Sequence, residues 1–322
     1  MKHLSLSPDD RVLVLGATGF IGSRLIRELA QKNIRMRLLV RNASKASALV
    51  PKKADAEIIE GDILKNINLQ QALKGIHSAY YLVHSMGGKL LSQQSDFAEK
   101  DKQAARNFVS AADASGLKRV IYLGGLGETG DNLSEHLRSR LDVAKILSEG
   151  KAKETFLRAA VIIGAGGASF EMLRYLVERL PVMTAPQWID TRIQPIAVQD
   201  VLAYLAGCLL DPETAGRTFD ICGHEVLTYR EMMEQYAEAR QIAKRFIVTV
   251  PFLTPKLSSY WVDLITPVPA GVAHPLIEGL KNEVVCRDSS IDEFVPIQKT
   301  SFQDAVKLAF SEETTGPGVT GF

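Results

Sequence analysis

The chain has 322 residues, of which 46% are hydrophobic and 23% are charged, a composition typical of a globular protein with one large or two small domains. Its formal net charge of +1 gives no electrostatic reason to expect binding to nucleic acid or to an anionic membrane. No uncharged apolar run reaches the thickness of a bilayer, so we expect no membrane span.

The first expected strand, residues 12–15, ends in three glycines with the spacing G-x-x-G-x-x-G. An amphipathic segment follows at once and predicts a helix. In such a turn the first glycine permits a sharp bend, the second admits a pyrophosphate, and the third lets the helix pack on the strand. The free N–H groups of the helix then bind phosphate. We therefore predict a dinucleotide site, the alternative being a turn without a ligand. Its residues are Gly16, Thr18, Gly19, Phe20, Ile21 and Gly22.

The second expected strand covers residues 35–40 and is followed by Arg41. A site that prefers NAD usually carries Asp or Glu at this place, where the carboxylate binds the ribose 2′-hydroxyl. A guanidinium instead binds a 2′-phosphate through charge-assisted hydrogen bonds. We therefore predict NADP(H) as the cofactor. Nearby cations are expected to keep the local field positive, unless they are ordinary solvated side chains. They are Arg35, Arg37, Lys45, Lys52 and Lys53.

The third and fourth expected strands, residues 56–60 and 79–84, supply further contacts to the cofactor. Asp62 and Ile63 follow the third strand on the ligand side of the sheet, where Asp62 could accept a hydrogen bond from adenine. The alternative is that Asp62 caps a following helix. The fourth strand ends where the nicotinamide half of the cofactor should pass. We expect contacts there from Val83, His84 and Ser85.

Helices and strands continue to alternate up to residue 166, which predicts a mostly parallel sheet with helices on both faces. The expected elements are a helix over 92–115, a strand over 120–123, a helix over 133–148 and a strand over 155–163. After residue 166 the regular alternation of strands and helices ends. The next expected elements are a helix over 170–180, strands over 193–198 and 218–222, a helix capped by Thr228, a proline-rich stretch over 250–275 and a frayed end over 314–322.

We therefore predict a doubly wound parallel sheet with a smaller C-terminal substrate cap. The sheet domain covers residues 1–166, and residues 193–225 return to it. The cap is built from residues 167–192 and 226–322.

The three cysteines are Cys208, Cys222 and Cys286. Their odd number and wide spacing disfavour a disulfide framework, and they lack the spacing of a metal site. The polar N-terminus does not resemble a signal peptide. We therefore expect a reducing compartment, with the cytoplasm as the simplest location.

With these motifs in place, the chain resembles the short-chain dehydrogenase/reductase superfamily, and within it the atypical branch near the NmrA-like and isoflavone-reductase-like proteins. The glycine turn, Arg41, Gly61-Asp62 and the segment 198–201 carry this resemblance. The chain is also similar to uncharacterised bacterial proteins described only as NAD(P)-binding or epimerase-like. That similarity spans residues 10–295 and is carried by the segments 81–87, 122–126, 169–175 and 257–261.

The resemblance implies a Rossmann fold, but one feature of the superfamily is missing. Its reductases and epimerases use Tyr-x-x-x-Lys and a Ser at the end of the preceding strand. Here His136 and Arg140 occupy the Tyr and Lys places, and the Ser place falls in Gly124-Gly125. His136 could relay a proton and Arg140 could hold the ribose or a phosphate. The alternative is that both are exposed helix residues at a site without acid–base chemistry.

Three functions follow from these features. The first is an NADP(H)-dependent oxidoreductase acting on a small carbonyl, enone or quinone. The second is a non-catalytic NADP(H)-sensing or partner-binding protein of the NmrA type, which the missing Tyr, Lys and Ser favour. A sugar-nucleotide epimerase is the weakest, because that chemistry depends on the missing Tyr. The resemblance also implies a possible homodimer formed by helices beside the sheet.

Overall fold

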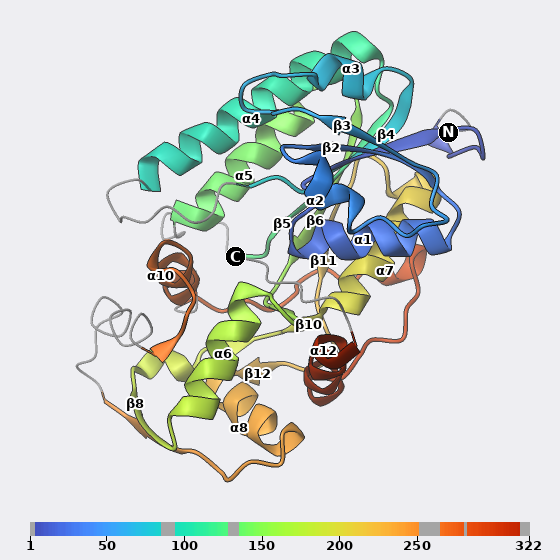
Figure 1. Ribbon diagram of the computed structural model, residues 1–322. Helices are drawn as coiled ribbons and strands as arrows, with labels where there is room; N and C mark the ends of the chain where they lie inside the picture. Colours follow the sequence, from blue (N-terminus) through green and yellow to red (C-terminus); the bar gives the residue numbers. More distant parts are fainter. Residues whose placement is uncertain (1–3, 85–93, 128–134, 251–264, 280–281, 316–322) are drawn as a thin grey trace.

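The computed structural model describes residues 4–84, 94–127, 135–250, 265–279 and 282–315. Its centre is a sheet of seven strands in the order β11-β6-β5-β4-β1-β2-β3, and every pair of neighbours is parallel (Figure 1). The strands are β1 (Arg11–Leu15), β2 (Arg35–Val40), β3 (Ala56–Glu60), β4 (Ile76–Tyr81), β5 (Arg119–Gly125), β6 (Lys153–Ala159) and β11 (Thr218–Ile221). This order confirms the expected doubly wound Rossmann sheet.

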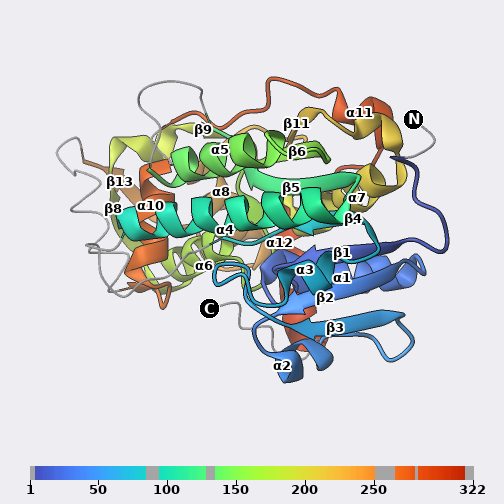
Figure 2. The same cartoon turned by 90° about the horizontal axis from the view of Figure 1, so that it is seen from above.

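Helices cover both faces of the sheet. On one face lie α1 (Phe20–Gln31) and α7 (Val198–Leu210), and on the other lie α4 (Gln94–Ser115) and α5 (Glu135–Ser148) (Figures 1 and 2). Successive residues of β1 alternate between the two faces: Val12 and Val14 pack toward α1, whereas Leu13 and Leu15 pack toward α4. Because both faces of β1 are buried, its residues 12–15 form a continuous apolar run.

Several expected strands have different boundaries in the structure. β4 covers 76–81 rather than 79–84. Its pairing with β1 stops at Tyr81, whereas the apolar run in the sequence continues beyond that residue. The expected strand over 155–163 is divided into β6 and β7 (Ile162–Ile163). β7 leaves the main sheet and pairs with β10 (Ile196–Ala197). Pro195, which has no N–H to donate, separates β10 from β9 (Arg192–Ile193).

A second layer packs below the carboxyl ends of the strands and has its own core (Figure 1). Its helices are α6 (Ala168–Arg179), α8 (Tyr229–Ala239), α10 (Ala270–Gly279) and α12 (Phe302–Thr315), and its strand pairs are β8 (Val182–Ala185) with β13 (Phe246–Thr249) and β9 with β12 (Leu227–Thr228). Thr228 caps α8 as expected, in a capping box with Glu231. The sequence did not predict α12. Residues 251–264 and 316–322 lie outside the described part.

The expectation of unpaired cysteines is wrong. Cys222, directly after β11, forms a disulfide with Cys286, with Cα atoms 6.2 Å apart. Cys208 is the odd residue, and it lies free and buried in α7. The disulfide joins the edge of the main sheet to the segment after α10, where the Arg287 N–H also donates to Asp220 of β11.

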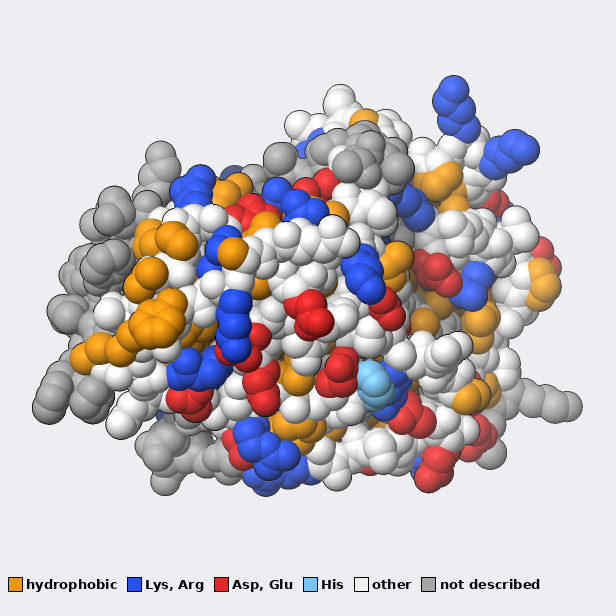
Figure 3. Space-filling view, turned by 90° about the horizontal axis from the view of Figure 1, so that it is seen from below, with side chains coloured by type: hydrophobic (Ala, Val, Ile, Leu, Met, Phe, Trp, Pro, Cys, Tyr) orange, Lys and Arg blue, Asp and Glu red, His pale blue; other side chains and the backbone are white. Residues whose placement is uncertain are grey.

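The surface of the second layer carries an apolar area on β8 and β13. Val182, Phe246 and Val248 are its exposed side chains, and Val182 lies beside Phe246 in register. Figure 3 shows apolar side chains gathered on the left of this face, with acidic and basic side chains interspersed across its middle. Within the described ranges, no helix has both the length and the apolar character needed to cross a bilayer.

One buried carboxyl group makes the stability of the fold depend on pH. Burial raises the pKa of Glu154 on β6 from 4.5 to about 8, and Oε1 has no hydrogen-bond partner. An acid with a raised folded-state pKa stabilises the fold below its unfolded pKa, and this contribution is lost as pH rises through the folded pKa. We predict that Glu154→Gln increases the free energy of unfolding by about 1–3 kcal/mol at pH 8.5 and changes it little at pH 4. Urea unfolding at the two pH values measures this, with the exposed Glu149→Gln as control. An equal effect of Glu154→Gln at both would contradict the prediction.

Candidate dinucleotide-binding site

The turn between β1 and α1 requires glycine at its first and third positions. Gly16 has a φ of +78°, and a Cβ there would lie 2.4 Å from the carbonyl oxygen of Leu82. A Cβ on Gly22 would lie 2.2 Å from the carbonyl oxygen of Gly16. Packing of the chain against itself therefore explains these two glycines without any ligand.

The second glycine has no such explanation. Gly19 is exposed, and its φ of −81° suits any residue. A Cβ there would contact only the carbonyl oxygen of Gly16, at 3.2 Å, and would otherwise project into open space. The open space at this position is what a closely approaching pyrophosphate needs.

The N-terminus of α1 is open to an anion. Gly19 provides no side-chain cap, and the first turn contains no acidic residue. Within the described part of the chain, the N–H groups of Phe20, Ile21 and Gly22 have no hydrogen-bond partner. Such N–H groups, together with the positive end of the helix dipole, favour bound phosphate. By contrast, the start of α6 is occupied by its own Glu171, which accepts a hydrogen bond from the Gly166 N–H at 2.9 Å.

The end of β4 lies beside the glycine turn, as the predicted site requires. The N–H of Leu82 donates to the carbonyl of Leu15 at 3.2 Å, which places the residues after β4 next to Gly16. Val83 is half-buried and His84 is exposed. Ser85 lies outside the described residues.

The predicted adenosine contacts gather at the ends of β2 and β3. Val40 and Glu60 are paired in register, so Arg41 and Asp62 follow at the same edge of the sheet. Arg41 is exposed and, among the described residues, has no hydrogen-bond or ion-pair partner. Asp62 does not cap a helix. Its Oδ1 accepts from the N–H groups of Leu64 and Lys65, and it forms a bridge with Ile67. Ile63 is buried beside this turn.

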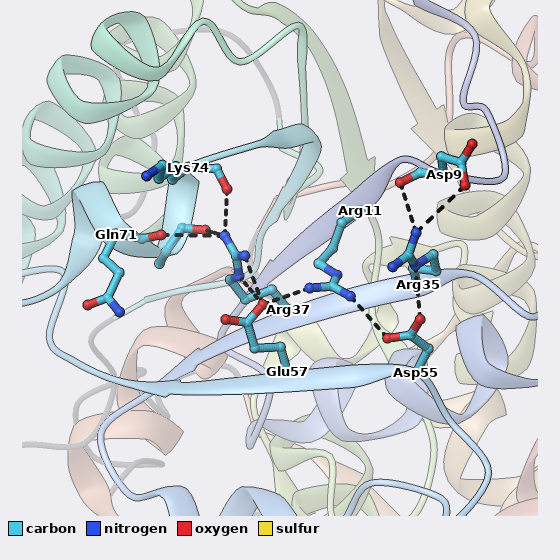
Figure 4. Close-up of polar contacts among 9 residues, drawn as sticks. Asp9, Arg11, Arg35, Arg37, Asp55, Glu57, Gln71 and Lys74 are labelled. Atoms are coloured by element: carbon cyan, nitrogen blue, oxygen red, sulfur yellow. Dashed lines mark hydrogen bonds and ion pairs between the residues drawn. The ribbon is translucent and has the colours of Figure 1, made fainter.

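Two of the cations expected to make this region positive are neutralised. Figure 4 shows Arg37 and Arg11 on the carboxylate of Glu57, and Arg35 on Asp55. The Arg37 contact is 2.8 Å and the Arg35 contact is 2.9 Å. The expectation that Arg35 and Arg37 add positive charge to this region is wrong. Asp55, directly before β3, neutralises Arg35, and Glu57 of β3 neutralises Arg37.

The predicted catalytic pair lies on α5, and of the two side chains only that of Arg140 belongs to the described part. Its side chain is 7% exposed, so the alternative of an exposed Arg140 is wrong. Its carbonyl accepts a hydrogen bond from the hydroxyl of Tyr122 at 3.2 Å. Burial raises the pKa of Tyr122 to about 12, and the charge of Arg140 opposes this shift. His136 belongs to the first turn of α5, but its side chain lies outside the described part.

A side chain at the place of the superfamily Ser would meet neighbouring side chains closely. A Cβ on Gly124 would lie 2.7 Å from the ring of Phe156, and one on Gly125 would lie 2.9 Å from the side chain of Leu137. A Ser at either position would therefore displace packed side chains.

Arg24, a buried cation one turn into α1, was not predicted from the sequence. Its guanidinium donates to the carbonyls of Phe20 at 2.9 Å and Ala165 at 2.7 Å, and it lies 2.9 Å from Glu312 of α12. It also stacks over the ring of Phe20, 4.5 Å from the centroid. The signal in the sequence was a charged residue within the apolar stripe that continues with Leu25 and Ile26.

Comparison with known proteins agrees with this site. Residues 16–163 match the family model described as NAD(P)H-binding. The photosystem II assembly factor Ycf39 of Trieres chinensis is 25% identical over 217 residues, which are 66% of this chain and 64% of Ycf39. The chain thus spans slightly less than two thirds of that relative.

Two solved structures share the fold. A nucleoside-diphosphate-sugar epimerase of Staphylococcus aureus superposes with a TM-score of 0.73 at 18% identity, covering 92% of this chain and 99% of the epimerase. The triphenylmethane reductase of Citrobacter sp., complexed with NADP(H), gives 0.72 at 19% identity, with the same coverage of 92% and 99%. At these identities the likeness establishes the fold alone.

The matched segment begins at Gly16 and contains the whole glycine turn. The NAD(P)H-binding family model and the Rossmann-like sheet therefore agree with the resemblance drawn from the sequence.

Proposed function

We propose that this protein is an NADP(H)-dependent oxidoreductase acting on a small carbonyl, enone or quinone. The observation that carries the proposal is the open N-terminus of α1 beside Gly19, a phosphate site that the described part of the chain leaves without a partner of its own. The cofactor, when bound, supplies hydride. The protein contributes binding, orientation and the exclusion of water.

Arg41 supports the choice of NADP(H) over NAD(H). It is exposed at the end of β2, and within the described residues it is not engaged by any carboxylate. A free guanidinium is available for a bidentate contact with a 2′-phosphate.

His136 is the proposed proton donor, because imidazole titrates near neutral pH. Arg140 was expected to hold ribose or phosphate. Its side chain is buried on α5, which favours a structural role there instead.

A non-catalytic NADP(H)-binding protein is the second candidate. The crowding at Gly124 and Gly125 favours it, since a Ser where the superfamily reductases carry one would have to displace neighbouring side chains. The name of Ycf39, an assembly factor, accords with a role in binding a partner.

The C-terminal helix connects the proposed phosphate site to the second layer. Glu312 pairs with Arg24, which holds Phe20 at the glycine turn. The next residue, Glu313, pairs at 2.5 Å with Arg174 of α6 rather than with Arg24. Two adjacent glutamates therefore have the same chemistry but different partners, which makes Glu313 a matched control for Glu312.

The first test concerns Arg41. We expect Arg41→Ala to weaken NADPH binding by about tenfold to a hundredfold, because a hydrogen bond to a charged group contributes roughly 1.5–3 kcal/mol. NADH binding should change little. Calorimetric titration measures both, with the exposed Lys52→Ala as control. An unchanged ratio of the two dissociation constants would refute the role of Arg41.

The second test concerns His136. If it donates the proton, His136→Ala should lower turnover by about 10²–10⁴-fold and leave the dissociation constant for NADPH unchanged. NADPH oxidation with a panel of carbonyl, enone and quinone acceptors measures turnover by absorbance. Equal turnover of the two proteins would exclude this role. Tight NADPH binding without turnover of the unmodified protein on any acceptor would favour the non-catalytic candidate.

The third test uses the two glutamates of α12. We expect Glu312→Gln to weaken NADPH binding by about fivefold, equivalent to roughly 1 kcal/mol, because Arg24 loses the charge that holds it. Glu313→Gln should leave NADPH binding unchanged. Thermal unfolding of both variants separates a local effect from a general loss of stability. Equal loss of affinity in the two variants would show that Arg24 does not position the turn.

A further inference from the structure

A carboxylate lies at the adenosine end of the site, beside the place where the sequence indicated only cations. Glu60 is the last residue of β3 and is paired in register with Val40, the last residue of β2. Its Oε2 accepts a hydrogen bond from the backbone N–H of Ala43 at 3.1 Å. The carboxylate is therefore held across the short segment that follows β2, within two residues of Arg41.

The backbone around Glu60 is firmly held. Its carbonyl accepts a hydrogen bond from the Asn68 side-chain amide at 2.8 Å. The next residue, Gly61, donates to the carbonyl of Val40 at 2.8 Å, and a Cβ on Gly61 would lie 2.4 Å from the carbonyl oxygen of Ile67. The side chain of Glu60 is thus exposed, while its backbone is held by hydrogen bonds. One carboxylate oxygen accepts a hydrogen bond from the Ala43 N–H.

Glu60 and Arg41 do not neutralise each other. Among the described residues Arg41 has no ion-pair partner, whereas the Glu60 carboxylate accepts a hydrogen bond from the Ala43 N–H. The two opposite charges therefore lie at neighbouring strand ends, each available to a ligand. This differs from the start of the same strands, where Arg35 and Arg37 are paired with carboxylates (Figure 4).

We propose that Glu60 is a specificity-determining residue that opposes Arg41. Its carboxylate accepts a hydrogen bond from a free ribose 2′-hydroxyl and repels a 2′-phosphate, whereas the guanidinium of Arg41 attracts the phosphate. The inference rests on the proposed dinucleotide function and adds to it. The protein accepts both NADPH and NADH, with a smaller preference for NADPH than Arg41 alone would give.

Glu60→Gln tests this directly. The amide oxygen still accepts from the Ala43 N–H, so the local structure is retained while the charge is removed. We expect the dissociation constant for NADPH to fall by about three- to tenfold, the size of one unit charge acting across a solvated surface, while that for NADH stays constant or rises. The titrations are calorimetric, at low ionic strength and again at about 0.5 M salt, where screening should reduce the effect.

Glu57→Gln is the matched control, because it removes the same charge from the same strand three residues away, about 10 Å along β3. Thermal unfolding of both variants checks that they fold. The inference is overturned if Glu60→Gln leaves the ratio of the NADPH and NADH dissociation constants unchanged, or if Glu57→Gln changes it equally. Binding of neither dinucleotide by the unmodified, folded protein would instead overturn the proposed function itself, and this inference with it.

Discussion

The close contact between Gly22 and Gly16 determines how the first helix meets the first strand. A single added carbon at Gly22 would come within 2.2 Å of the Gly16 carbonyl oxygen, so any side chain would push α1 away from β1. Leu82 closes the turn from the side of β4, with its carbonyl oxygen 2.4 Å from the position of a Cβ on Gly16. These two contacts leave Gly19 at the open side of the turn, beside N–H groups that the described part of the chain does not use. The proposed phosphate site is a consequence of this packing.

The second layer reaches the same turn through Arg24. This buried guanidinium joins the carbonyl of Phe20 to that of Ala165, which lies in the loop after β7, and is paired with Glu312 of α12. The ring of Phe20 also packs against that loop, since a Cβ on Gly167 would lie 2.9 Å from it. The backbone that would bind pyrophosphate is therefore fixed through Arg24 by contacts with Ala165 and Glu312, which are distant in the sequence.

The sequence predicted the parts that depend on local pattern. β2 and β3 begin and end where expected, and the glycine spacing located the turn at the start of α1. β4 was placed three residues late, because the run of apolar residues is longer than the paired strand. α12 was missed, although Ser301 directly before Phe302 is a typical N-cap residue and accepts a hydrogen bond from the Asp304 N–H at 3.1 Å.

Features that depend on residues distant in sequence could not be predicted. The disulfide joins cysteines 64 positions apart, and the odd number of cysteines argued against it. The neutralisation of Arg35 and Arg37 and the contact of Glu60 with Ala43 follow from the register of β3 against β2, which single-strand patterns do not give. The chemistry at His136 is not settled by pattern either, because a His in place of the superfamily Tyr is compatible with a proton donor or with no catalysis.

Calorimetric titration of the purified, cofactor-free protein with NADPH and then NADH tests the central claim most directly, because it reports on the glycine turn without requiring a substrate. We predict saturable binding of one NADPH per chain, with NADH binding more weakly. If neither dinucleotide binds while circular dichroism shows a folded protein, the open N-terminus of α1 is not a dinucleotide site and the central claim is contradicted.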